Sequence, residues 1–186
     1  KTTTAINLSA SLAAMKQRVL LVDTDPQGNA TTGVGIDKFA LEKGTDSVLL
    51  GNLSAETAML SIQPGGFFLL AANTDLTAAE LKLLNIPDRE RSLANALSLC
   101  KKDFDYIIID CPPSLNILTL NALVASNHIL ITMQCEYFAL EGLTSLLETV
   151  SGVKRSANKE LGIVGILRTM YDPRSSLTSD VSAQLH

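Results

Sequence analysis

Residues 1–25, KTTTAINLSASLAAMKQRVLLVDTD, carry the pattern that decides the fold. Lys1 and the threonines after it lead into a stretch with helical spacing, and the next run, RVLLVD at residues 18–23, is apolar and ends in an acid. A lysine, a hydroxyl and a helix in this order normally follow a glycine-rich phosphate loop, although no glycine stands before Lys1 here. The stretch predicts a helix followed by a buried strand, and it makes Lys1 and Thr2 candidates for binding a phosphate.

The rest of the chain repeats this alternation of helices and buried strands. Short apolar runs that end in acids, glycines or polar residues are typical of buried parallel strands. Such runs occur at residues 67–73, 105–110, 128–133 and 161–167, and stretches with helical spacing occur at residues 3–16, 88–102, 114–127 and 139–158. Together they predict a doubly wound α/β fold, with a mostly parallel sheet flanked by helices.

The length and composition are those of one globular domain. We predict a single domain over residues 1–186, with a variable insertion at residues 31–66, where glycines are frequent and only short helical pieces occur. Residues 175–186 have the pattern of a further helix. The formal net charge of −4 excludes a broadly basic nucleic-acid coat, so that any contact with nucleic acid must be local. The sequence has no run of about 18 apolar residues, and we expect a cytoplasmic protein.

Acidic residues follow two of the predicted strands at the sheet edge where ligands bind. Parallel sheets bind ligands at the carboxyl ends of their strands. Asp23 and Asp25 end the first strand, Asp110 ends the strand at residues 105–110, and Lys1 and Thr2 enter the first helix. A site for phosphate and Mg²⁺ needs a lysine, a hydroxyl and a carboxylate such as these. The alternatives are that the threonine only caps a helix and that the acid at the strand end only caps the next helix.

Three segments of the sequence resemble one known family. DTDPQGNAT at residues 23–31, YIIIDCPPSLNILTLNAL at 106–123 and MQCEYFALEGL at 133–143 are similar to segments of the chromosome and plasmid partitioning ATPases of the ParA/Soj type, within the deviant-Walker P-loop ATPases. The resemblance covers nearly the whole chain and is weakest at residues 36–66. It implies an interior fragment of a P-loop ATPase domain, truncated at both ends, that lacks the first strand with most of the phosphate loop and the C-terminal elements.

The resemblance assigns nucleotide contacts to the first residues of the chain. Lys1 matches the lysine that contacts the β and γ phosphates of ATP. Thr2 matches a ligand of Mg²⁺, and Thr3 matches a residue that lies against the α-phosphate. These matches make ATP and Mg²⁺ the expected cofactors and ATP hydrolysis the expected reaction.

The resemblance also assigns roles to the three acids. Asp25 matches the residue that positions and polarises the attacking water, and Asp110 matches one that holds Mg²⁺ through water. Asp23 is expected to give a supporting contact near the metal and is a possible metal ligand. We expect Asp23 and Asp25 to serve different roles, with one as an anchor while the other faces the ligand.

The family's partners follow from the same resemblance. It implies a homodimer with ATP between the subunits, non-specific binding to DNA, stimulation by a centromere-binding partner protein, association with the nucleoid in the ATP state and no membrane contact. Arg174 matches an arginine that contacts DNA, although Pro173 before it departs from the family pattern. Three basic residues near residue 155 fit a solvated helix face or a second DNA surface: Lys154, Arg155 and Lys159.

Three alternatives stay open at this point. One is the division-site-positioning ATPase of the same superfamily, which binds membranes, and another is a nucleotide-binding switch with negligible turnover. The third is a protein that holds an iron–sulfur cluster through cysteines, like the nitrogenase iron protein. The spacing of Cys100, Cys111 and Cys135 favours reduced thiols over a zinc site or a disulfide framework. Cys111 and Cys135 lie inside segments that resemble the partitioning family, and the resemblance implies that they are structural and do not bind a cluster.

Overall fold

The computed structural model describes residues 1–183, without side-chain detail for residues 137–141, 176, 177, 179 and 180. The sequence predicts one domain over residues 1–186, and the structure describes two compact units, residues 1–125 and the part of the chain from residue 126 onward. Each unit is described by itself. The helix predicted at residues 175–186 is present as α9, Ser176–Ala183, and residues 184–186 lie outside the described residues.

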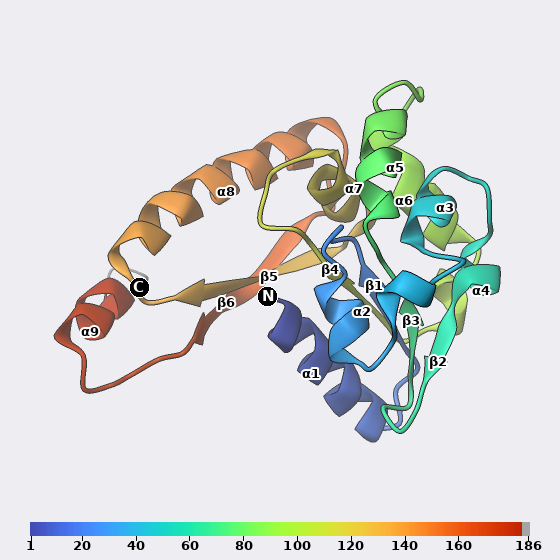
Figure 1. The fold of residues 1–186 in the computed structure, drawn as a ribbon. Helices are drawn as coiled ribbons and strands as arrows, with labels where there is room; N and C mark the ends of the chain where they lie inside the picture. Colours follow the sequence, from blue (N-terminus) through green and yellow to red (C-terminus); the bar gives the residue numbers. More distant parts are fainter. Residues whose placement is uncertain (184–186) are drawn as a thin grey trace. The chain divides into compact units, whose positions relative to one another are not determined.

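The first unit is an α/β layer structure around a four-stranded sheet (Figure 1). Its strands are β1 (Val19–Asp23), β2 (Leu60–Ile62), β3 (Phe67–Leu70) and β4 (Tyr106–Asp110). Its α-helices are α1 (Thr2–Ala14), α2 (Asn29–Gly33), α3 (Thr45–Leu49), α4 (Ala55–Ala58), α5 (Asp75–Leu83), α6 (Ser92–Ser98) and α7 (Ile117–Ala125). Short 3₁₀ helices are η1 (Lys38–Ala40), η2 (Arg89–Arg91) and η3 (Lys101–Asp103).

The strand order β2-β3-β1-β4 confirms the predicted, mostly parallel sheet. β1 pairs in parallel with both β3 and β4, whereas β2 is antiparallel to β3. The central strand β1 is completely buried, as its apolar sequence predicts. β2 lies inside the segment at residues 31–66, which therefore contributes an edge strand to this sheet.

The side chains of β1 alternate between two hydrophobic cores, one on each face of the sheet. Leu20 and Val22 pack into a cluster that includes residues of α3, α5, α6 and α7. Val19 and Leu21 pack into a second cluster with residues of α1 and α2. Successive side chains of a strand point to opposite faces, so a strand that is apolar at every position is held from both sides. This places the carboxyl end of β1 rigidly between two helical layers.

The described residues of the second unit form two parallel strands and two helices. β5 (His128–Gln134) and β6 (Gly162–Thr169) pair along their whole lengths, with one irregularity between Ile129 and Leu130. Helix α8 (Tyr137–Ser156) connects them, and α9 follows β6. Residues of β5, α8, β6 and α9 meet in a small apolar cluster that includes Met133, Cys135 and Val181.

Candidate functional site

Three segments that are far apart in the sequence meet at the carboxyl edge of the sheet in the first unit. In the parallel register of β1 and β4, Asp23 lies directly beside Asp110. The Nζ atom of Lys1, at the start of α1, donates a hydrogen bond to the carbonyl oxygen of Pro112, at 3.2 Å. The acids and the lysine singled out in the sequence are therefore brought together by neighbouring strand ends.

The start of α1 leaves its hydroxyl side chains uncommitted to capping. Lys1 occupies the N-cap position, Thr2 is the first helical residue, and no side chain makes a capping hydrogen bond there. The main chain begins the helix through the bond from the amide of Ala5 to the carbonyl of Lys1, at 3.0 Å. The alternative that these threonines serve as helix caps is therefore wrong, because no threonine holds that position.

Asp110 carries a buried oxygen that accepts no hydrogen bond. Its Oδ2 atom is the one buried side-chain nitrogen or oxygen without a hydrogen-bond partner among the residues that the structure describes. Burial raises the pKa of Asp110, and the nearby Thr2 hydroxyl and the positive charge of Lys1 lower it. An unpaired buried carboxylate oxygen is costly unless a ligand completes it.

The acid does not cap the next helix either. The Oδ1 atom of Asn116 accepts hydrogen bonds from the amides of Leu118 and Thr119, both at 3.1 Å, and so caps the start of α7. Asp110 therefore has no capping role. A carboxylate and a hydroxyl oxygen are hard ligands of the kind that Mg²⁺ prefers, so Asp110 and Thr2 fit a magnesium ion.

Asp23 is fully buried, and both of its oxygens have protein partners. Oδ1 accepts a hydrogen bond from the amide of Asp25 at 3.1 Å. Oδ2 accepts two from Thr31, from its amide at 2.9 Å and from its hydroxyl at 2.8 Å. Burial raises the pKa of Asp23 to about 6, and these hydrogen bonds lower it. The engaged oxygens favour an anchoring role for Asp23 over direct metal binding.

Asp25 lies at the edge of the same loop, 6% exposed. Its Oδ1 atom accepts a hydrogen bond from the amide of Gln27 at 2.9 Å, and its carbonyl accepts one from the amide of Gly28 at 2.8 Å. Before it, both the amide and the hydroxyl of Thr24 donate to the carbonyl of Asp110, at 2.9 and 2.7 Å. The main chain that carries Asp25 is thus bonded on both sides, which fixes where its carboxylate can point.

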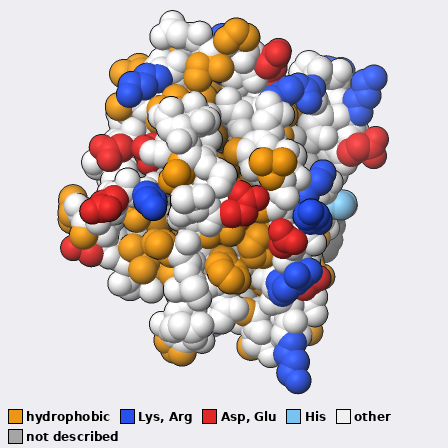
Figure 2. Space-filling model, turned by 90° about the vertical axis from the view of Figure 1, so that its right-hand side faces the viewer, with side chains coloured by type: hydrophobic (Ala, Val, Ile, Leu, Met, Phe, Trp, Pro, Cys, Tyr) orange, Lys and Arg blue, Asp and Glu red, His pale blue; other side chains and the backbone are white. Residues whose placement is uncertain are grey.

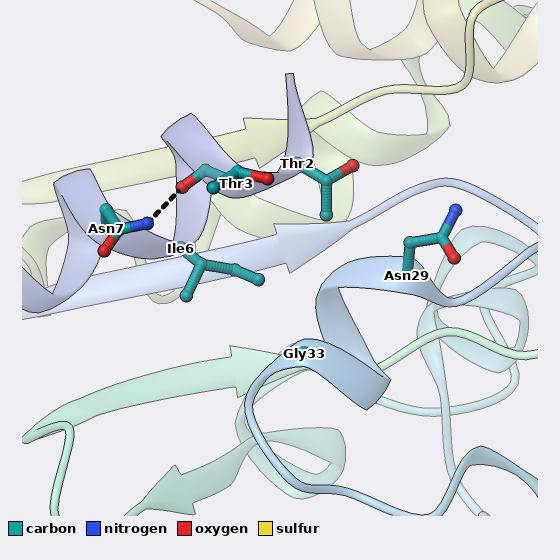
Figure 3. Close-up of a pocket in the computed structure, with 6 residues that line it drawn as sticks. All are labelled: Thr2, Thr3, Ile6, Asn7, Asn29 and Gly33. Carbon is teal, nitrogen blue, oxygen red and sulfur yellow. Dashed lines mark hydrogen bonds between the residues drawn. The ribbon is translucent and has the colours of Figure 1, made fainter.

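A pocket of about 630 Å³ opens between α1 and α2 in this unit. Figure 3 shows Thr2 and Asn29 at one end of it and Asn7 at the other, with the Asn7 amide donating to the carbonyl of Thr3 at 2.8 Å. Ile6 and Gly33 complete the lining. The expected nucleotide contacts Thr2 and Thr3 therefore line an open, largely uncharged pocket, whereas Asn29 is a lining residue that the sequence did not single out.

Arg174, the expected DNA contact, lies in the second unit between β6 and α9. Its guanidinium binds both oxygens of Asp172 at 3.0 Å, and its side chain is 88% exposed. The hydrogen bonds from Arg174 lower the pKa of Asp172. This acid was not singled out from the sequence, although the pattern D-P-R places it two residues before the arginine.

The cysteines and the helices supply no further site among the described residues. Cys100, Cys111 and Cys135 are all free thiols, and burial raises the pKa of Cys111 to about 11. Within the described part of the chain, no group of three or more histidine, cysteine or acidic residues is placed to hold a metal ion. None of the helices described is both long and apolar enough to cross a membrane.

Comparison with known proteins identifies the family. The family model described as an AAA domain matches residues 1–163. The chromosome partitioning protein ParA of Myxococcus xanthus is 46% identical over 97% of this chain and 64% of its own length. The sporulation initiation inhibitor protein Soj of Bacillus subtilis is 46% identical over 95% of this chain and 70% of its own length. The chain belongs to the ParA/Soj-type family of P-loop ATPases.

A solved structure extends the likeness from sequence to fold. A protein from Mycobacterium smegmatis described as cobyrinic acid a,c-diamide synthase, with a bound ATP analogue and magnesium, superimposes with a TM-score of 0.94. It is 42% identical, over 98% of this chain and 75% of its own. The predicted α/β fold of the ParA/Soj-type chain is confirmed. The acids and threonines of the first unit all lie within the matched residues 1–163, whereas Arg174 lies beyond them.

Proposed function

We propose that this protein is a partitioning ATPase for DNA segregation that binds ATP with Mg²⁺, forms a homodimer with ATP between its subunits, and hydrolyses ATP slowly. The proposal includes non-specific DNA binding and stimulation by a centromere-binding partner protein. Membership of the ParA/Soj-type family and the name of the Myxococcus xanthus relative support it. The observation that carries it is the unpartnered, buried Oδ2 atom of Asp110 near Lys1 and Thr2, because a bound cation would complete an oxygen that is otherwise costly to bury.

The start of α1 and the end of β4 hold the nucleotide and its metal in this proposal. Lys1 binds the β and γ phosphates with a charge-assisted contact, and Thr3 lies against the α-phosphate. Thr2 and Asp110 would hold Mg²⁺, which neutralises charge on the phosphates when it is bound. Peptide amides at the N-terminus of α1 add a favourable dipole for an anion. Phosphoryl transfer needs mainly positioning and charge neutralisation, so this set requires no covalent nucleophile.

Asp25 positions the attacking water in this proposal. Its Oδ1 atom is occupied by the amide of Gln27, while no hydrogen bond within the described residues engages its Oδ2 atom. One oxygen is thus used to orient the carboxylate and the other is left for a water molecule. This division of labour is what a positioned base requires, because geometry must be set before the proton is taken.

Arg174 supplies the DNA contact in the second unit. Its ion pair with Asp172 is exposed, so water and salt screen it, and a DNA phosphate can compete for the guanidinium. Figure 2 shows acidic and basic side chains interspersed on the face that it displays, a distribution that does not favour binding DNA through bulk charge on that face. A few arginines or lysines presented twice by a dimer then have to provide the phosphate contacts.

The decisive experiment compares Asp25→Asn with Asp37→Asn. The carboxamide introduced by Asp25→Asn can still accept the bond from Gln27, so the loop is kept while the carboxylate is lost. Asp37 is an exposed acid with the same local bond, from the amide of Phe39 to Oδ1 at 2.9 Å. Asp25→Asn should bind ATP and accumulate as a dimer on size-exclusion chromatography, with hydrolysis about 10²-fold slower or more. Asp37→Asn should hydrolyse ATP at the wild-type rate.

The same assay separates the enzyme from its alternatives. An Asp25→Asn protein with wild-type turnover would refute the role of Asp25. A wild-type protein that binds ATP but shows no turnover, with or without a centromere-binding partner, would be a nucleotide-dependent switch. Binding of the ATP form to anionic lipid vesicles in preference to DNA would identify a membrane-positioned ATPase instead.

A further inference from the structure

A continuous chain of buried hydrogen bonds ties the loop that carries Asp25 to β3. It starts at the amide of Asp25, which donates to Oδ1 of Asp23 at 3.1 Å, and continues from Oδ2 of Asp23 to the hydroxyl of Thr31 at 2.8 Å. That hydroxyl in turn accepts a hydrogen bond from the amide of Ala72 at 2.8 Å. Asp23, Thr31 and Ala72 are each 0% exposed. These hydrogen bonds connect residues within the loop from β1 to α2, and they also connect this loop to the end of the neighbouring strand.

The hydroxyl of Thr31 connects the two halves of this hydrogen-bond network, because it is both a donor and an acceptor. It donates its proton to Asp23 and uses a lone pair for Ala72, which only a hydroxyl side chain of this size can do. Without it, the amide of Ala72 would be a buried donor lacking this acceptor, and Asp23 would lose one of its three donors. Buried polar networks of this kind hold a unique geometry when every member is satisfied.

The close approach of main chains at Gly28 shows how tightly the loop is seated against β3. A Cβ atom built on Gly28 would lie 2.6 Å from the carbonyl oxygen of Ala72, well inside contact distance. The loop and the end of β3 therefore touch through backbone as well as through Thr31. Only the Asp23 carboxylate lies between Thr31 and the amide of Asp25, so a displacement of Thr31 reaches Asp25 through a single side chain.

We propose that Thr31 is a positioning residue for ATP hydrolysis, which holds the Asp25 carboxylate in place through Asp23 and the end of β3. The inference rests on the proposed function, in which Asp25 positions the attacking water. Among the described residues, Thr31 makes no hydrogen bond to Lys1, Thr2 or Thr3, so its effect is on the geometry of the reacting water and leaves ATP binding largely unchanged.

The test replaces Thr31 in the full chain and measures ATP hydrolysis and ATP binding separately. Thr31→Val keeps the shape and removes the hydroxyl, and it should lower kcat by about 10- to 100-fold, as small misplacements of reacting groups do. The KM for ATP should change by no more than about twofold, because the lost interaction acts on the transition state. Thr31→Ser, which keeps the hydroxyl, should restore kcat to within about threefold of wild type.

Thr45 provides a matched control for general damage to the fold. It is also 0% exposed, and its hydroxyl donates to the carbonyl of Ala71 at 3.0 Å, next to Ala72, without touching Asp23 or Asp25. Thr45→Val removes a buried hydrogen bond of the same kind at the same strand end. It should leave kcat within about twofold of wild type, since it does not act on the reacting water.

A double-mutant comparison shows whether Thr31 acts through Asp25. In an Asp25→Asn background, Thr31→Val should cause little further loss of kcat, because the group that it positions is already absent. If Thr31→Val does not fold, as judged by circular dichroism, Thr31→Cys serves in its place, because a thiol is a weak donor of similar size; kcat should then fall at least about fivefold.

Each outcome decides between the inference and its alternatives. Wild-type kcat in folded Thr31→Val or Thr31→Cys, an equal loss in Thr45→Val, or a full additional loss in the Asp25→Asn background would overturn the positioning role. Wild-type turnover of Asp25→Asn alone would instead refute the proposed function. A slow Asp25→Asn protein beside an unimpaired Thr31→Val protein would refute only the inference about Thr31.

Discussion

Replacing Gly28 by alanine should destabilise the fold more than the same change at any open turn. Gly28 has φ of +60°, where a residue with a Cβ atom is strained, and the new Cβ would lie 2.6 Å from the carbonyl oxygen of Ala72. Strain in the left-handed region costs about 1 kcal/mol, within a range of about 1–2 kcal/mol. Forcing an added methyl group into packed backbone costs a further ~1–3 kcal/mol. We expect a total loss of about 3 kcal/mol for Gly28→Ala.

Gly51 separates the two contributions. It has φ of +72° and lies in the same unit, but a Cβ atom there would meet no atom within 4 Å. Gly51→Ala should therefore cost only the backbone strain, about 1 kcal/mol. In a chain of this length, 1 kcal/mol lowers Tm by about 2–4 °C, so we expect losses of about 9 °C for Gly28→Ala and about 3 °C for Gly51→Ala.

Urea unfolding monitored by circular dichroism, together with calorimetric Tm values, measures both losses. The slope of the free energy of unfolding against urea should be the same for the two variants, since neither changes the surface exposed on unfolding much. Equal losses in the two variants would refute the reasoning, because they would show that the end of β3 moves away from an added methyl group without cost. A larger loss for Gly51→Ala would do the same.

Four further changes probe the site and the DNA contact. Lys1→Ala should weaken ATP binding by about 10- to 100-fold in equilibrium titrations, because a charge-assisted contact to phosphate is worth ~1.5–3 kcal/mol; unchanged affinity would place the phosphates elsewhere. Asp110→Asn should raise the Tm of the metal-free protein, since burial disfavours the charged form of the acid. The same change should abolish any rise in Tm that Mg²⁺ and ATP cause in the wild type, and retention of that rise would refute the metal role. Arg174→Ala should weaken DNA binding equally on unrelated sequences. It should also reduce the slope of log affinity against log salt by about 0.9 per lost contact, or roughly 2 for a symmetric dimer, and an unchanged slope would move the DNA surface to other basic residues. Asp172→Asn should instead strengthen DNA binding.

The sequence predicted the parallel strands from their apolar runs, but burial at every position is found only in the central strand β1, whereas in β4 only Asp110 is buried. VLLVD and YIIID are apolar at nearly every position, and both form parallel strands as expected. The predicted strand at residues 67–73 ends earlier, at Leu70, because the next two residues bond to side chains and loops. The carbonyl of Ala71 accepts from Thr45, and the amide of Ala72 donates to Thr31.

Elements that depend on tertiary partners escaped the sequence patterns. β2 has only three residues, Leu60–Ile62, and exists through its antiparallel pairing with β3. Helix α5, Asp75–Leu83, was not predicted either. At the site, the sequence predicted which residue types lie at the strand ends, but it did not predict the unpaired oxygen of Asp110 or the proposed role of Thr31. Both depend on which atoms happen to face each other after folding.

Two hydrogen bonds from Thr24 to the carbonyl oxygen of Asp110 join the loop after β1 to the last residue of β4. The residues are 86 positions apart along the chain, yet the amide and hydroxyl of one share the backbone oxygen of the other. A displacement at the end of β4 is therefore carried to the residue directly before Asp25, without any chain of side-chain rearrangements between them. In the proposed function, a displacement of Asp110 on binding of Mg²⁺ would therefore also move the main chain that carries Asp25.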